Sequence, residues 1–168
     1  MKDITRGRKF NAEELQLATL WFLRESPEHG YSLAKRFVEI SGGYYQPSSG
    51  VLYPALADLE ALGFAKNEPL GKRKTYHILP AGLAHLEQHE QQAQLLINTL
   101  KHLAKKMLWM QMQPEGEIAA AEATGWLPEF IDARKAFKAA LLEKTDIDHN
   151  EQRRIADILR RATQEICA

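Results

Sequence analysis

The sequence predicts a mainly α-helical protein, in which three short helices and a β-hairpin are followed by a second, wholly helical region. Three observations lead to this expectation. Apolar residues recur at helical spacing in three successive segments, two strand-like segments joined by a glycine-containing loop come next, and a seven-residue apolar repeat begins after residue 80. Three helices followed by a β-hairpin with a basic tip form a winged helix-turn-helix.

The first two helices are expected at residues 11–25 and 30–40. Asn11 is a good N-cap, and Glu14 stands three residues later, which is the spacing of a capping box. The apolar residues of both segments recur every three or four positions, so each helix has one inward face. Two packed helices therefore precede the third.

The third helix is the most informative segment, because its two sides differ. Its inward face is expected to carry leucines at spacings of four, three and three, namely Leu52, Leu56, Leu59 and Leu62. Ser48 or Ser49 is expected to cap its start, and Gly63 to end it. Pro54 predicts either an irregular first turn or a later start. A helix that is apolar on one side and carries small hydroxyl groups at its start is typical of DNA recognition.

The β-hairpin is expected at residues 64–68 and 74–79, with its basic tip at Lys72, Arg73 and Lys74. A second basic cluster, with Arg6 and Arg8, lies in an arm of residues 1–10. The formal net charge of the whole chain is zero, so positive charge is local rather than general. Each Lys or Arg that neutralises a DNA phosphate releases counterions, so a few per subunit suffice for binding. A solvated basic loop is the alternative interpretation of the wing cluster.

Separate roles are predicted for the residues around the third helix. Ser48, Ser49 and Gly50 lie at its N-terminus, where amide donors and the helix dipole favour a phosphate. Base contacts specify sequence, and Tyr53 and Gln46 are the candidates for them. Lys35, on the second helix, is a candidate for the flanking DNA backbone.

Four motifs together resemble the PadR family of bacterial transcriptional regulators. They are His29-Gly30-Tyr31, the run from Pro47 to Pro54, the run from Leu59 to Gly63, and the junction from Tyr76 through Leu79-Pro80-Ala81-Gly82. The similarity covers roughly residues 12–90, in the right order and spacing. Val51 departs from the pattern, because the family more often has Thr there. The resemblance implies a homodimeric winged-helix repressor that binds operator DNA and releases it when a ligand binds.

The second half is expected to begin with one long helix, from residue 80 to about residue 113. Its apolar residues follow the a and d positions of a coiled coil. We predict that they form a dimer interface, made by Leu86, Ala93, Leu96, Leu100, Leu103, Met107 and Met110. An intramolecular bundle that uses the same stripe is the alternative. The predicted domains are residues 1–80 for DNA binding and residues 81–168 for dimerisation and effector binding.

Two more helices are expected after this long one, at residues 128–144 and after a cap at Asp146 or Asp148. Their sequences resemble, to a limited extent, a metal-responsive subgroup of the PadR family. That subgroup has a His-rich N-terminal extension, whereas residues 1–10 contain no His. His85 and His89, four residues apart, are more simply explained as interface residues than as metal ligands. No metal site and no cofactor is therefore predicted.

The effector is predicted only by class, as a small aromatic molecule or a metal ion. Trp109 and Trp126 are the large aromatic side chains of this half, and they are the candidates for an effector pocket. Plain core packing explains them equally well.

Several other classes of protein are disfavoured. The sequence has no glycine-rich phosphate loop, no HExxH motif and no nucleophile elbow, so we expect no enzyme. Cys167 is the only cysteine, which suits a reducing cytoplasm, and we interpret it as a free terminal thiol rather than a redox or intersubunit group. Neither a membrane span nor a signal peptide is expected. The alternative function is that of a winged-helix adaptor that binds proteins and has no sequence-specific affinity for DNA.

Overall fold

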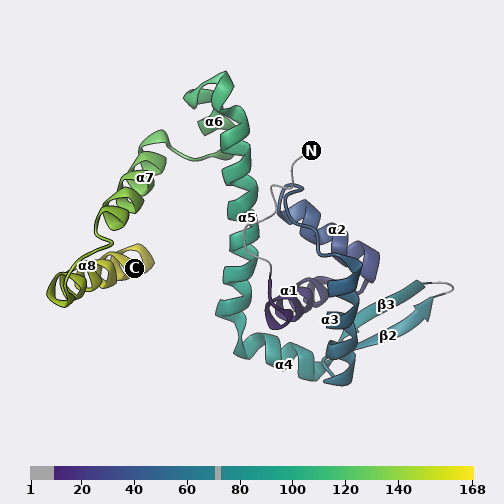
Figure 1. The fold of residues 1–168 in the computed structure, drawn as a ribbon. Helices are drawn as coiled ribbons and strands as arrows, with labels where there is room; N and C mark the ends of the chain where they lie inside the picture. Colours follow the sequence, from purple (N-terminus) through teal and green to yellow (C-terminus); the bar gives the residue numbers. More distant parts are fainter. Residues whose placement is uncertain (1–9, 71–72) are drawn as a thin grey trace. The chain divides into compact units, whose positions relative to one another are not determined.

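A computed structural model describes residues 10–70 and 73–168 of the chain, which are mainly helical (Figure 1). Its elements are α1 (Ala12–Glu25), β1 (Glu28–His29), α2 (Gly30–Ile40), α3 (Ser49–Ala61), β2 (Ala65–Leu70), β3 (Arg73–Ile78), α4 (Pro80–Gln88), α5 (Glu90–Met112), the 3-10 turn η1 (Gln113–Glu115), α6 (Glu117–Thr124), α7 (Pro128–Glu143) and α8 (His149–Cys167). The chain divides into two compact units, Met1–Thr124 and Gly125–Ala168. A functional boundary after residue 80 stays a prediction.

The predicted winged helix-turn-helix is confirmed. Helices α1, α2 and α3 precede an antiparallel hairpin of β2 and β3, which extends beside α3 as the wing (Figure 1). The sheet has the strand order β1-β3-β2, because the two residues of β1 pair with Tyr76 and Thr75 of β3. This short strand was not predicted from the sequence. It ties the start of α2 to the wing.

The capping box at the start of α1 is confirmed. The Glu14 backbone amide donates to Asn11 Oδ1 at 2.8 Å, and the Asn11 amide donates to Glu14 Oε2 at 3.1 Å. Two of the four orphan amides at this helix end are thereby satisfied. Sequence rules therefore define this boundary well.

Three of the four leucines predicted for the inward face of α3 are buried, namely Leu52, Leu56 and Leu59. The prediction for Leu62 is wrong, because its side chain is 56% exposed. Leu62 is the C-cap, and the chain turns at Gly63, whose φ of 70° favours glycine. The Phe64 amide donates back to the Leu59 carbonyl at 2.9 Å, and Phe64 packs against the core instead.

Helix α3 begins at Ser49 and continues through Pro54. Of the two alternatives that the proline left open, the later start is therefore excluded. The missing proline amide falls opposite the carbonyl of Gly50, four residues earlier and exposed.

The single long helix predicted from residue 80 to about residue 113 is wrong in one respect, because it is broken at His89. The backbone of His89 has φ −113° and ψ 22°, and this residue ends α4 and begins α5. The bend allows both α4 and α5 to pack against α1. A seven-residue repeat continues through such a bend unchanged, so periodicity alone does not reveal the break.

The bend also corrects part of the predicted dimer interface. Four of its seven residues belong to the buried core of the first unit, in which α4 packs against α1 and α5 packs against α1 and α2: Leu86, Ala93, Leu96 and Leu100. Side chains already buried within one chain are not available to a second subunit. Leu103 and Met107 are partly exposed and Met110 is exposed, so an interface through these three stays a prediction.

The second unit consists of α7 and α8. Asp148, one of the two predicted caps, accepts hydrogen bonds from the amides of Asn150 and Glu151 at 2.7 and 2.9 Å. Apolar side chains of this unit are largely exposed: Leu127, Phe130, Phe137, Leu141, Leu142, Ile158 and Ile166. Among the described helices of the whole chain, none is long and apolar enough to cross a membrane.

Candidate nucleic-acid interface

The N-terminus of α3 presents uncapped backbone donors. Ser48 is the N-cap residue, but its side chain makes no capping hydrogen bond, which corrects the expected hydroxyl cap. Ser48, Ser49 and Gly50 are all exposed. The first backbone bonds of the helix are made by the amides of Val51 and Leu52, which both donate to the Ser48 carbonyl. Amides at the start of an uncapped, exposed helix are available to an anion.

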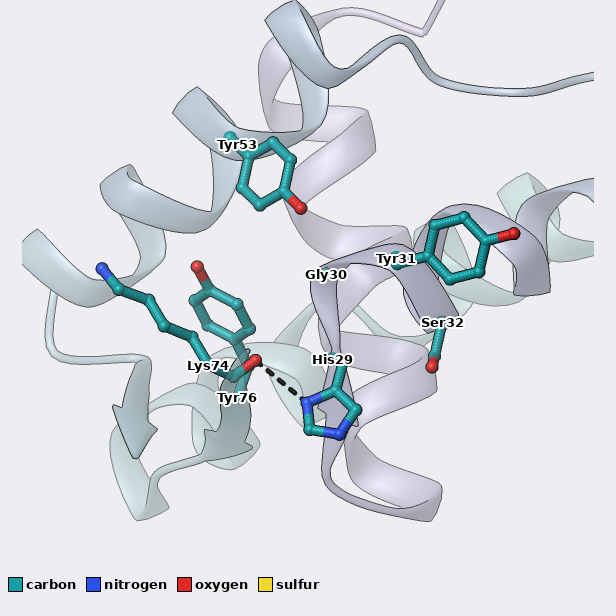
Figure 2. Close-up of a pocket in the computed structure, with 7 residues that line it drawn as sticks. All are labelled: His29, Gly30, Tyr31, Ser32, Tyr53, Lys74 and Tyr76. Carbon is teal, nitrogen blue, oxygen red and sulfur yellow. Dashed lines mark hydrogen bonds between the residues drawn. The ribbon is translucent and has the colours of Figure 1, made fainter. Parts of the chain in front are cut away.

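A groove of about 490 Å³ lies beside α3, where three elements converge (Figure 2). The N-terminus of α2 forms one wall, the outward side of α3 the second, and β3 the third. Its lining residues are His29, Gly30, Tyr31, Ser32, Tyr53, Lys74 and Tyr76. The hydroxyl residues Ser32, Tyr53 and Tyr76, the ammonium group of Lys74 and the N-terminus of α2 therefore line one hollow. The exposed Tyr31 also belongs to this lining.

The absence of a side chain at Gly30 brings α2 close to Tyr53. A Cβ atom at Gly30 would lie 2.9 Å from Cε1 of Tyr53, which is closer than real side chains approach. His29, the N-cap of α2, makes no side-chain capping bond, so the first amides of this helix also lack a capping side chain. The positive end of the α2 dipole therefore lies directly beside the Tyr53 ring.

Lys74 and Tyr76 reach the groove from the same face of β3, because alternate residues of a strand point the same way. The Tyr76 side chain is only 4% exposed, and its hydroxyl points into the groove (Figure 2). Burial raises the pKa of Tyr76, and Glu60 and Tyr53 raise it further, so this hydroxyl stays protonated and can donate. Among residues 10–70 and 73–168 no ion pair of the Lys74 ammonium is present.

His29 holds the start of α2 against the wing. Its Nδ1 lies 3.2 Å from the Lys74 carbonyl oxygen (Figure 2) and 3.1 Å from Oγ1 of Thr75. A carbonyl oxygen only accepts, so the bond to Lys74 requires the proton on Nδ1. His29 therefore has a positioning role in the groove, through the same β1–β3 pairing that fixes Gly30.

The part of the chain that forms this groove also matches a known protein family. Residues 19–88 match the Transcriptional regulator PadR-like family, and they include α2, α3 and both strands of the wing. The chain carries a PadR-like domain. The groove between α2, α3 and β3 lies entirely within it.

Two curated relatives match part of this chain. The chain is 32% identical over 97 residues to the Transcriptional regulator YqjI of Escherichia coli (strain K12), and equally to the uncharacterized protein YqjI of Shigella flexneri. The match covers 57% of this chain and 47% of each relative. The chain thus spans about half the length of the curated relatives it matches.

The solved structures that this chain resembles include one that is bound to DNA. Bacillus subtilis PadR in complex with operator DNA has 22% sequence identity and a TM-score of 0.40, over 77% of this chain and 92% of that one. The transcriptional regulator TA0346 of Thermoplasma acidophilum has 29% identity and a TM-score of 0.45, over 56% of this chain and 92% of that one.

The PadR-like domain brings together only some of the residues predicted to contact DNA. Tyr53 and Lys74 share the groove, whereas Gln46 and the start of α3 lie outside its lining. Lys35 is exposed, and its Nζ lies 3.5 Å from Oε1 of Glu39, so the carboxylate compensates part of the lysine charge. Arg6, Arg8 and Lys72 lie outside the described residues, and Arg73 is described only by its backbone in β3.

The sequence did not assign five of the groove residues to this site: His29, Gly30, Tyr31, Ser32 and Tyr76. His29, Gly30 and Tyr31 were recognised only as a motif of the family. The alternation of Lys74 and Tyr76 along β3 was the available signal for Tyr76, since the two residues share a face. Nothing in the sequence indicated that the start of α2 would lie against the wing.

The two predicted effector residues lie in different units. Trp109 is buried in the first unit, on α5, and Trp126 belongs to the second. A second groove of the first unit, about 430 Å³, is lined by neither of them. It contains His85, whose ring stacks on Phe64 at 4.5 Å and lies 4.4 Å from the His89 ring. Burial lowers the pKa of His85, and the neighbouring His89 lowers it further, which favours the neutral form of the His85 ring.

Gly30→Ala should separate stability from DNA affinity. The added methyl group must displace the Tyr53 ring, while alanine is a better helix former than glycine by about 1 kcal/mol. We expect unchanged or slightly higher resistance to urea. Binding to a duplex that the wild type has enriched from a random-sequence library should be roughly 10-fold weaker, a loss of about 1.4 kcal/mol in binding free energy. Urea unfolding and fluorescence anisotropy measure the two effects. Affinity equal to that of the wild type would remove Tyr53 from the interface.

Proposed function

We propose that this protein is a transcriptional regulator that binds double-stranded DNA through its PadR-like domain. The observation that carries the proposal is the groove in which Lys74, Tyr76 and Tyr53 surround the uncapped start of α2. An ammonium group, hydroxyl donors and a helix N-terminus together suit a phosphate diester. The exposed, uncapped start of α3 supplies a second group of donors along the same helix as Tyr53.

In this proposal α3 enters the major groove and the wing contacts the flanking backbone. Tyr53, which is half-exposed, and Gln46 read base edges, while Ser48, Ser49 and Gly50 contact phosphate. Arg6, Arg8, Lys35, Lys72 and Arg73 add positive charge around this surface. The neutral net charge of the chain means that affinity comes from this local arrangement and not from a general attraction to nucleic acid.

The protein acts in this proposal as a homodimeric repressor on a palindromic operator. The exposed apolar side chains of α7 support a dimer, since Phe130, Phe137 and Leu141 lie seven and four residues apart on one helix face. Such exposed apolar groups mark surfaces that bind another protein. Leu103, Met107 and Met110 of α5 remain candidates for the same interface. A small aromatic molecule or a metal ion then serves as the releasing effector.

Two variants test the roles within the DNA interface. A duplex enriched from a random-sequence library by the full-length wild type serves as the probe, beside an unselected duplex. Lys74→Ala should weaken binding to both duplexes and lower the slope of log affinity against log salt by about one per subunit. Tyr53→Ala should weaken binding to the selected duplex by roughly 10-fold and affect the unselected one less.

Lys105→Ala is the matched control for charge, because Lys105 is exposed on α5, away from the groove lining. It should leave both affinities unchanged. Equal effects of Tyr53→Ala on the two duplexes would contradict its role in specificity. If the wild type enriches no duplex at all and its binding does not depend on salt, the protein is an adaptor rather than a regulator.

A further inference from the structure

The turn between α2 and α3 is a stiff segment that leads directly into the recognition helix. Gly42 and Gly43 have φ of 63° and 88°, conformations that favour glycine. The Gly43 amide donates to the Val38 carbonyl at 2.7 Å, and the Tyr45 amide donates to Oγ of the buried Ser41 at 2.9 Å. The backbone of this turn is therefore held by hydrogen bonds at both ends.

The residue that follows the turn is anchored in the core. The Tyr45 ring packs edge-on against Phe10 at 4.9 Å and against Phe37 at 5.8 Å. Only Gln46 and Pro47 separate Tyr45 from Ser48, the N-cap of α3, and Pro47 is buried. A shift of the turn is therefore transmitted to the start of α3, with little slack in between.

Helix α5 touches this turn from outside the three-helix core. A Cβ atom at Gly42 would lie 3.1 Å from Cβ of Ala104, so the turn backbone lies directly on α5. About two turns later along the same helix, the Gln111 side-chain amide donates to the Tyr44 hydroxyl. Ala104 and Gln111 are seven residues apart and so lie on one face of α5.

The same face of α5 is fixed in the core at its other end. Ala93, Ile97 and Leu100 precede Ala104 at spacings of four, three and four, and all three are buried. The helix is continuous from Glu90 to Met112. It therefore acts as one rod, with its first half packed in the winged-helix core and its second half against the α2–α3 turn.

We propose that Gln111 is a positioning residue for DNA recognition, which holds the α2–α3 turn through Tyr44 and thereby sets the position of the α3 N-terminus. The proposal rests on the proposed function for its effect on DNA. It makes α5 the element through which an event on its exposed side is transmitted to the DNA interface. Leu103, Met107 and Met110, which are partly or fully exposed, lie on that same half of α5.

A double-mutant cycle tests the contact. Tyr44→Phe and Gln111→Leu each remove one partner of the same hydrogen bond, in the full-length chain. Each should weaken binding to the selected duplex by about 3- to 10-fold, the effect of one neutral hydrogen bond, and affect the unselected duplex less. The double variant should bind the selected duplex no more weakly than the weaker-binding single variant, because the two changes remove the same interaction. Gln91→Leu, on an exposed position at the start of α5, is the control and should bind as the wild type does.

A measurement without DNA accompanies the cycle. Hydrogen exchange of the Gly43, Tyr45, Val51 and Leu52 amides should be faster in Gln111→Leu than in Gln91→Leu, while the urea midpoints stay equal. Wild-type affinity in both single variants, additive losses in the double variant, or unchanged exchange would each overturn the proposal. Failure of the proposed function has a different signature: the wild type enriches no duplex, although Gln111→Leu still accelerates exchange in the turn.

Discussion

Replacing Phe137 and Leu141 together by aspartate should convert the proposed dimer into a monomer and weaken binding to the selected duplex by about 100-fold or more. The second half-site is bound intramolecularly only while the two subunits are joined, and such linkage contributes a factor of about 10² to 10⁴. Phe137 is 49% exposed and Leu141 is also exposed, so a charged group at these positions costs the single chain little. At an apolar interface the same charges remain without partners.

Sedimentation measures the first effect, and binding to whole and half operators measures the second. The double variant should bind a half-site duplex as well as the wild type does, since the PadR-like domain is untouched. Ala139→Asp is the matched control, because it places the same carboxylate on an exposed position two residues from Phe137 and hence on another side of α7. A double variant that sediments as the wild type does would remove α7 from the interface.

Gly82→Ala should destabilise the first unit by about 3 kcal/mol, at the upper end of the usual cost of overpacking. A Cβ atom at Gly82 would overlap the carbonyl oxygen of Phe64 and lie 2.8 Å from its carbonyl carbon. Both atoms belong to the backbone, so no side chain can rotate away. The same carbonyl accepts the Leu79 amide at 2.9 Å, which fixes the start of α4 next to the wing.

Urea unfolding monitored by circular dichroism measures this loss, and thermal unfolding should show a midpoint lower by about 6 to 12 °C. Gly50→Ala is the matched control for stability. It adds the same methyl group in the first turn of α3, where the nearest atom, Oγ of Ser48, is 4.0 Å away. Equal stability of Gly82→Ala and the wild type would mean that α4 does not approach Phe64 this closely.

Local signals account for the parts of the fold that were predicted correctly. The side chain of Asn11 and the backbone of Glu14 are three residues apart, so their capping box depends on no distant contact. The same holds for the Gly63 turn, the Asp148 cap and the hairpin of β2 and β3. Each of these interactions joins residues close in the chain, which is why residue type and spacing were enough.

The errors occur where residues distant in the chain compete for the same surface. Leu62 fits the leucine repeat of α3, but the chain leaves the helix there and Phe64 packs against the core instead. The apolar stripe after residue 80 was interpreted as a seam between subunits, whereas its first part fills the core of the same chain. Periodicity identifies an apolar face without identifying its partner.

By itself, the sequence determined the winged helix-turn-helix, the place of its third helix and its PadR-like character, because capping residues, turn glycines and apolar periods act over a few positions. Only the tertiary structure decided that the helical segment after residue 80 breaks at His89 into α4 and α5 and that α5 reaches the α2–α3 turn. It also decided that Tyr53, Lys74, Tyr76 and the start of α2 surround one groove. Those arrangements depend on which apolar faces bury one another and on how closely backbones approach at Gly30, Gly42 and Gly82. Such packing is a property of the whole folded chain, so no short segment encodes it.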